Sequence, residues 1–75
     1  MEINSFVENF ASQFEDTDPS AFTPETKFKE LEEWSSLSAL LIIAMMDETY
    51  GVKIKGDDIR NSVTIEDLFN AAKSK

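Results

Sequence analysis

Apolar residues recur at helical spacing in the first part of the chain. Residues 3–14 carry an apolar side chain at every third or fourth position, namely Ile3, Phe6, Val7, Phe10, Ala11 and Phe14. Polar residues such as Glu8 and Gln13 fall on the opposite side. This spacing predicts an amphipathic helix near residues 3–14 with one buried face. Ser5 and Glu8 could also form a capping box, which leaves the first residue of the helix open.

The central stretch is apolar around its whole circumference. Residues 39–46 read Ala-Leu-Leu-Ile-Ile-Ala-Met-Met. Ser35 is a favourable N-cap and Gly51 a favourable left-handed C-terminal residue, so a helix is expected over residues 36–50. A helix that is apolar on every side is either enclosed or presented to a partner. Full enclosure is hard to achieve in a chain of 75 residues.

The last part of the chain has the strongest local helix signature. Thr64 and Asp67 form a variant of the capping box, which predicts a helix over residues 64–72. Its buried stripe consists of Ile65, Leu68, Phe69 and Ala72.

The connecting segments complete the prediction of the fold. Residues 15–35 form a long connection that we expect Phe22, Phe28 and Leu31 to pin to the core. Residues 52–55 alternate like a strand but have no second strand to pair with, so we expect an extended loop, followed by a brief helical turn at residues 56–61. The chain is therefore expected to be one all-α domain over residues 1–75, a small four-helix bundle with a long first loop and a short third helix. The side chains expected to be largely buried are Phe6, Phe10, Leu40, Ile43, Met46, Ile54, Ile59, Leu68 and Phe69.

Composition narrows the possible functions. Fifteen acids against seven bases give a net charge of −8, which disfavours binding to nucleic acids and to acidic membrane surfaces. Such a charge attracts a basic protein partner, although it could serve solubility alone. The chain has no cysteine and no histidine, so disulfides are excluded and a zinc site is improbable. The longest apolar run is far below the roughly 20 residues that cross a bilayer, so we expect a soluble, cytoplasmic monomer.

Two motifs could carry chemistry. Residues 47–58 have the length of a calcium-binding loop, but the position that requires glycine holds Val52, which excludes this reading. Ser36 is the stronger candidate, because the first position of a helix leaves its hydroxyl open to solvent and favours an anion beside it. With no histidine to act as its base, Ser36 is expected to be modified by another enzyme rather than to act as a catalytic nucleophile. The alternative is that Ser36 only caps the helix.

Residues 28–69 resemble the acyl carrier protein family. The matching features are Leu31 and Trp34 ahead of Ser36-Leu37, the acidic and aromatic helix end at residues 46–52, and the segments 57–59 and 63–68. The resemblance implies that Ser36 carries a covalent 4′-phosphopantetheine arm, whose thiol holds acyl groups as thioesters. It implies a carrier that shuttles these intermediates between biosynthetic enzymes and is not itself an enzyme. The alternative is a small acidic helical interaction module without a prosthetic group.

The chain departs from the family pattern beside Ser36 and along the central helix. Ser35 stands where the family usually has aspartate, and Ser38 and Leu41 stand where the family often has acids. The resemblance implies as partners a phosphopantetheinyl transferase and acyl-transferring or synthase enzymes with basic surfaces. The expected docking surface has an apolar centre and an acidic rim, made of Leu37, Leu41, Met45, Glu33, Asp47 and Glu48. Leu41 and Met45 could instead be ordinary core residues.

Overall fold

The computed structural model describes residues 2–75, and all the regular secondary structure in this part of the chain is helical, without strands. The four α-helices are α1 (Ile3–Ala11), α2 (Ser36–Tyr50), α3 (Gly56–Arg60) and α4 (Ile65–Lys73). Two short 3₁₀ turns, η1 (Pro19–Ala21) and η2 (Phe28–Glu30), lie in the long connection between α1 and α2. The predicted fold, a four-helix bundle with a long first loop and a short third helix, is confirmed.

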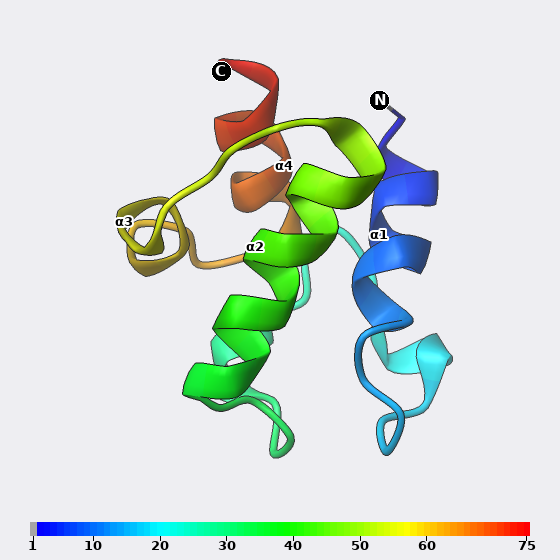
Figure 1. Cartoon of the computed structure of the whole chain (residues 1–75). Helices are drawn as coiled ribbons and strands as arrows, with labels where there is room; N and C mark the ends of the chain where they lie inside the picture. Colours follow the sequence, from blue (N-terminus) through cyan, green and yellow to red (C-terminus); the bar gives the residue numbers. More distant parts are fainter. Residues whose placement is uncertain (1) are drawn as a thin grey trace.

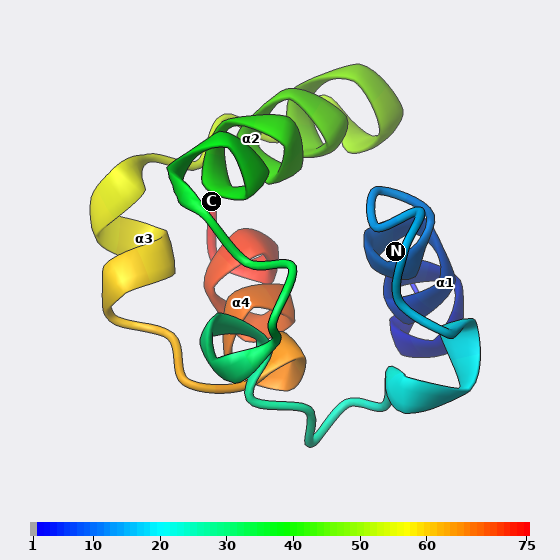
Figure 2. The same ribbon diagram turned by 90° about the horizontal axis from the view of Figure 1, so that it is seen from below.

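The three longer helices surround one core. Figure 1 shows α1 running in the opposite direction to α2 and α4, with both chain ends at the same end of the bundle. Helix α1 contacts both α2 and α4, and the short α3 contacts α2 and α4 on the other side of the molecule. Viewed from below, α3 lies beside α2 and α4 and far from α1 (Figure 2).

Aromatic rings fill the centre of the bundle. Phe10 is fully buried and lies 5.3–6.3 Å, between ring centroids, from four other phenylalanines. Phe28 is also fully buried, and its ring makes an edge-on contact with Trp34 at 5.1 Å. The ring of Phe28 also makes an edge-on contact with Phe10 of α1 at 5.3 Å, and this contact joins the long connection to the core.

Helix α1 is shorter than its apolar stripe. It ends at Ala11 rather than near residue 14 because two side chains, Ser12 Oγ and Gln13 Nε2, donate to the carbonyl of Asn9 and compete with the helical pattern. Phe14 nevertheless remains buried. The sequence left the first residue of this helix open. In the structure Glu2 is the N-cap, and its carboxylate accepts hydrogen bonds from the backbone N–H groups of Asn4 and Ser5.

The orientation of α2 differs in part from the prediction. The helix buries Ser38, Ile42, Met45 and Met46, and it exposes the opposite side. The predicted burial of Leu40 is wrong, since 62 % of this residue is exposed, and Ile43 is only half-buried. The other seven side chains expected in the core are buried. Leu40 is exposed because it lies across the helix from Ile42 and Met46, which face the aromatic core.

The long connection is fastened to the rest of the bundle along its length. Phe22 and Phe28 are buried and Leu31 is half-buried, as predicted. The carbonyls of Pro24 and Thr26 accept hydrogen bonds from the first backbone N–H groups of α4. These carbonyls satisfy donors that a helix start otherwise leaves unpaired.

The remaining segments follow the prediction closely. Residues 52–55 are extended, with Ile54 buried and Val52 half-buried. Helix α4 begins with the expected capping box, in which Thr64 and Asp67 exchange hydrogen bonds. The backbone N–H groups of Thr64 and Val63 hold the pKa of Asp67 below its usual range. Among residues 2–75, none of the helices combines the length and the apolar character needed to cross a membrane.

Candidate functional site

Three serines shape the start of α2. Ser35 is the N-cap, and its hydroxyl accepts a hydrogen bond from the backbone N–H of Ser38 at 3.4 Å. The hydroxyl of Ser38 accepts from the backbone N–H of Ser35 at 3.1 Å and donates to the carbonyl of Glu33 at 3.2 Å. Ser38 is buried by this network. Sequence reasoning missed this capping box, because serine is not the usual residue at its second position.

Ser36 is the first residue of α2 and stays outside this network. Ser36 is exposed, and the capping hydrogen bonds run between Ser35, which precedes it, and Ser38, two residues after it. The first turn of a helix has free backbone N–H groups and the positive end of the helix dipole, both of which favour a negatively charged group on this hydroxyl. The alternative that Ser36 caps the helix is therefore wrong, since Ser35 does so.

An open groove lies beside Ser36, between the start of α2 and α3. Its volume is about 430 Å³, and it is lined by Lys29, Trp34, Ser35, Ser36, Ala39, Gly56, Ile59 and Arg60. The ammonium group of Lys29 donates to the carbonyls of Ile59 (3.2 Å) and Arg60 (2.9 Å), which holds the long connection against α3. The groove therefore has an apolar floor and a basic edge, which suits a phosphate-bearing group attached to Ser36.

The apolar residues expected to bind a partner are separated by the fold. Leu37 is 65 % exposed and Leu41 is 42 % exposed, so both are on the open face of α2. Met45 is only 5 % exposed and packs in the core, so its expected place on the docking surface is wrong. It is buried because it is next to Ile42 and Ser38 on the inner side of the helix. The exposed Leu40, which sequence reasoning assigned to the core, takes its place on the open face.

The acidic residues expected at the rim also differ in what they contact. Glu33 is half-buried, and its carboxylate accepts hydrogen bonds from the Thr17 hydroxyl at 2.6 Å and the Asp16 backbone N–H at 3.2 Å. Asp47 pairs with Lys53 at 3.2 Å. Glu48 is exposed. Glu33 thus stabilises the long connection, and its carboxylate is less available to a partner than that of Glu48.

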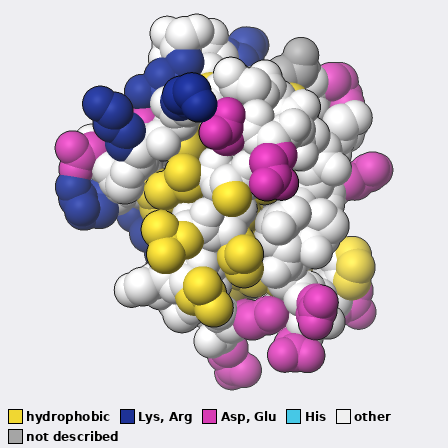
Figure 3. Space-filling model, in the orientation of Figure 1, with side chains coloured by type: hydrophobic (Ala, Val, Ile, Leu, Met, Phe, Trp, Pro, Cys, Tyr) yellow, Lys and Arg dark blue, Asp and Glu magenta, His cyan; other side chains and the backbone are white. Residues whose placement is uncertain are grey.

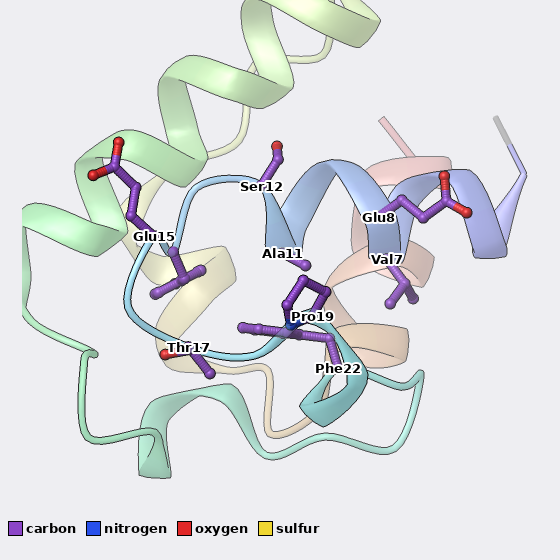
Figure 4. A pocket seen from close by; sticks show the side chains of 9 residues that line it. Val7, Glu8, Ala11, Ser12, Glu15, Thr17, Pro19 and Phe22 are labelled. Carbon is purple, nitrogen blue, oxygen red and sulfur yellow. The ribbon is translucent and has the colours of Figure 1, made fainter.

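A second hollow, on the side of α1, contains none of these residues. Its volume is about 330 Å³ and its lining is mostly apolar, with Pro19 and Phe22 lying beneath the last turns of α1 (Figure 4). The groove beside Ser36, and not this second hollow, is therefore the one relevant to a group attached to the Ser36 hydroxyl.

Fold and site together define an attachment domain, a small helical bundle that presents one serine hydroxyl at a helix start. A comparison with protein families agrees, because the family described as "Phosphopantetheine attachment site" matches residues 5–71. The chain belongs to this family, and the resemblance to acyl carrier proteins is confirmed. Neither the comparison with curated proteins nor that with solved structures gives a match. Domains of this family carry 4′-phosphopantetheine covalently, typically have no catalytic activity of their own and interact with modifying and synthase enzymes.

Proposed function

We propose that the protein is an acyl carrier whose arm is attached to Ser36. The observation that supports this most strongly is the exposed hydroxyl of Ser36 at the first position of α2, outside the Ser35–Ser38 capping network. When bound, 4′-phosphopantetheine supplies a thiol that holds acyl groups as thioesters. The protein would present these intermediates to successive biosynthetic enzymes. We place this activity in the cytoplasm and expect the carrier to be a monomer.

Loading requires a transferase, because the chain has no histidine that could activate Ser36. In that transfer, the Ser36 oxygen bonds to the phosphorus that bears pantetheine, and the phosphoanhydride bond of coenzyme A breaks. The nucleotide bisphosphate leaves, and the hydroxyl proton passes to the transferase. The decisive experiment incubates the protein with coenzyme A and a phosphopantetheinyl transferase and measures the intact mass. A mass increase that peptide mapping places on residue 36 supports the proposal, and an unchanged mass contradicts it.

The alternative function is an acidic interaction module without a prosthetic group. It explains the exposed leucines of α2 equally well, but it leaves the free Ser36 hydroxyl and the family match at residues 5–71 without a role. The carrier function is therefore the one we propose.

Ser35 is expected to limit the rate of loading. The family usually has an aspartate at this position, and Ser35→Asp restores a carboxylate beside the attachment site, where a transferase and its magnesium ion would dock. We expect a several-fold faster loading rate and a change in the free energy of unfolding within about 0.5 kcal/mol, since both residues cap helices well. The rate of loading and the midpoint of urea denaturation are measured on the unmodified chain and on Ser35→Asp. Equal rates would show that the missing carboxylate has no importance for loading.

The proposed docking surface surrounds Ser36 and uses Leu37 and Leu41, with Glu33, Asp47 and Glu48 at its rim. Partners would be the transferase and acyl-transferring or synthase enzymes whose surfaces are basic. Exposed apolar side chains in the middle supply affinity, and charges at the rim increase the rate of encounter.

Leu41 tests whether this surface binds through apolar contact. Leu41→Glu should weaken binding to such an enzyme about tenfold, because it places a charge where an apolar pocket is expected. It should destabilise the fold by less than about 1 kcal/mol, because Leu41 is 42 % exposed and lies outside the buried core. Binding affinity and the midpoint of urea denaturation, measured on the same variant, decide whether Leu41 binds a partner or supports the core. A large loss of stability would show that Leu41 belongs to the core.

A further inference from the structure

The hollow on the side of α1 has no part in the proposed function. Its floor is the edge of the aromatic core, where side chains that are otherwise buried keep 4–8 % of their surface exposed, namely Val7, Ala11, Phe14 and Phe22. Its volume of about 330 Å³ lies at the lower end of the range of small-molecule sites, about 300–1,000 Å³. Such sites are lined by apolar side chains with a few polar groups. The hollow therefore has the size and the lining of a site for a small ligand.

The rim of the hollow defines the charge of that ligand. Glu8 and Glu15 lie on opposite sides of the hollow, with Pro19 and Phe22 between them, and both carboxylates are directed outward (Figure 4). Both acids are exposed, and neither belongs to the three ion pairs found within residues 2–75. The other residues of the lining are uncharged. A positively charged group at the rim would therefore meet two carboxylates without competition from a basic side chain of the lining.

The surroundings of the hollow have the same sign of charge. Residues 1–26 contain six acids and no base, and the first base of the chain is Lys27. On the face shown in Figure 3, basic side chains gather on the side of α3, whereas the charged side chains on the side of α1 are acidic. Such a surface attracts cations and repels anions. It therefore disfavours the carboxylate of a fatty acid and the phosphate of the arm as occupants of the hollow.

We propose that this hollow is a binding site for a small organic cation, an ammonium group that carries a hydrocarbon chain or ring. The hydrocarbon part covers the floor formed by Ala11, Phe14 and Phe22, and the ammonium group stays in water at the rim, close to Glu8 and Glu15. This division is favourable because the burial of apolar surface drives binding, while a charge that stays hydrated is not desolvated. The site goes beyond the proposed function, since none of its lining residues lines the groove beside Ser36.

Phe14 connects the hollow to a spectroscopic reporter. Its ring stacks on that of Trp34, the one tryptophan of the chain, with 6.1 Å between the centroids. A ligand against Phe14 should therefore change the fluorescence of Trp34. Because Trp34 also lines the groove beside Ser36, fluorescence detects binding without locating it. The change in amide chemical shifts, measured by NMR, locates the ligand.

The test titrates the protein at neutral pH with alkylamines from butylamine to octylamine. We expect saturable binding, with the largest changes in chemical shift within residues 7–22. Full burial of a methylene group is worth about fourfold in affinity, so each added carbon should tighten binding about twofold in this partly open hollow, until the hollow is filled. Hexanol and hexanoate are compared with hexylamine. At low salt, hexylamine should bind about fivefold more tightly than hexanol, and hexanoate most weakly.

Two pairs of substitutions separate local from overall charge. Glu8→Gln/Glu15→Gln should remove the preference for hexylamine and leave the affinity for hexanol unchanged. The matched control, Glu25→Gln/Glu48→Gln, changes two exposed acids outside the hollow and should keep the preference. Each pair takes the net charge from −8 to −6.

Two single substitutions locate the site. Ala11→Leu should fill the hollow and weaken the binding of hexylamine at least tenfold, whereas Ser36→Ala should bind hexylamine like the unmodified chain. Thermal unfolding checks that each variant is folded, and if Ala11→Leu is not, the pair Glu8→Gln/Glu15→Gln decides alone.

The proposal is overturned by equal affinities for hexylamine and hexanol, by a lack of saturable binding, or by changes in chemical shift centred on the groove beside Ser36. Unchanged binding to a folded Ala11→Leu variant would overturn it too. The unloaded chain is sufficient for every one of these measurements, so a failure of Ser36 to accept 4′-phosphopantetheine would contradict the proposed function and leave this site unaffected.

Discussion

Ser36→Ala is expected to abolish loading with 4′-phosphopantetheine completely. The substitution removes the one hydroxyl at the start of α2 that is exposed and outside the capping network. Alanine is a good helix former, and Ser35 still caps the helix, so the free energy of unfolding should change by less than about 0.5 kcal/mol. Intact mass after incubation with transferase and coenzyme A measures the effect. Circular dichroism shows whether the helices are retained.

Ser38→Ala is the matched control for this experiment. Its hydroxyl is buried and makes hydrogen bonds with Ser35 and Glu33, so its loss should destabilise the protein by about 1 kcal/mol. Loading should continue on the folded fraction. Loading that persists in Ser36→Ala, or that stops in a folded Ser38→Ala, would show that the attachment residue is wrongly assigned.

Phe10→Ala is expected to have the largest effect on stability. Phe10 is fully buried, and its ring contacts the rings of Phe6, Phe14, Phe22 and Phe28. Truncating a phenylalanine in such a position costs about 3–5 kcal/mol, which is a large share of the stability of a small domain. Urea denaturation followed by circular dichroism should show a mostly unfolded protein or a greatly lowered midpoint.

Leu40→Ala provides the comparison for Phe10→Ala. Leu40 is also an apolar helical residue, but it is mostly exposed, so its truncation should cost less than about 1 kcal/mol. A loss for Leu40→Ala as large as that for Phe10→Ala would mean that the outer face of α2 contributes to the core after all.

The features that depend on neighbouring residues could be predicted from the sequence. Both ends of α2 follow from Ser35 and Gly51, and the start of α4 follows from Thr64, since each of these residues acts on the turn beside it. The same local reasoning put Ser36 at the first position of α2 and made it the candidate attachment residue. The buried face of α1 was equally clear, because its stripe contrasts with polar residues on the other side.

The rotation of α2 could not be predicted, because this helix is apolar all round. Only its packing against Phe rings from α1 and the long connection decides that Met45 turns inward and Leu40 outward. The contacts by which Glu33 stabilises the long connection could not be predicted for a similar reason. Its hydrogen bonds join it to Asp16 and Thr17, which are far away in sequence and carry no local sign of the contact.

The many attachments of the long connection have a consequence for how a carrier of this kind moves. Phe22, Phe28, Glu33 and Lys29 divide residues 12–35 into short closed segments, each of which has few conformations left to explore. In the function that we propose, the reach from one enzyme to the next would then come from the rotatable bonds of the arm and from diffusion of the whole domain, rather than from movement of the segment before α2.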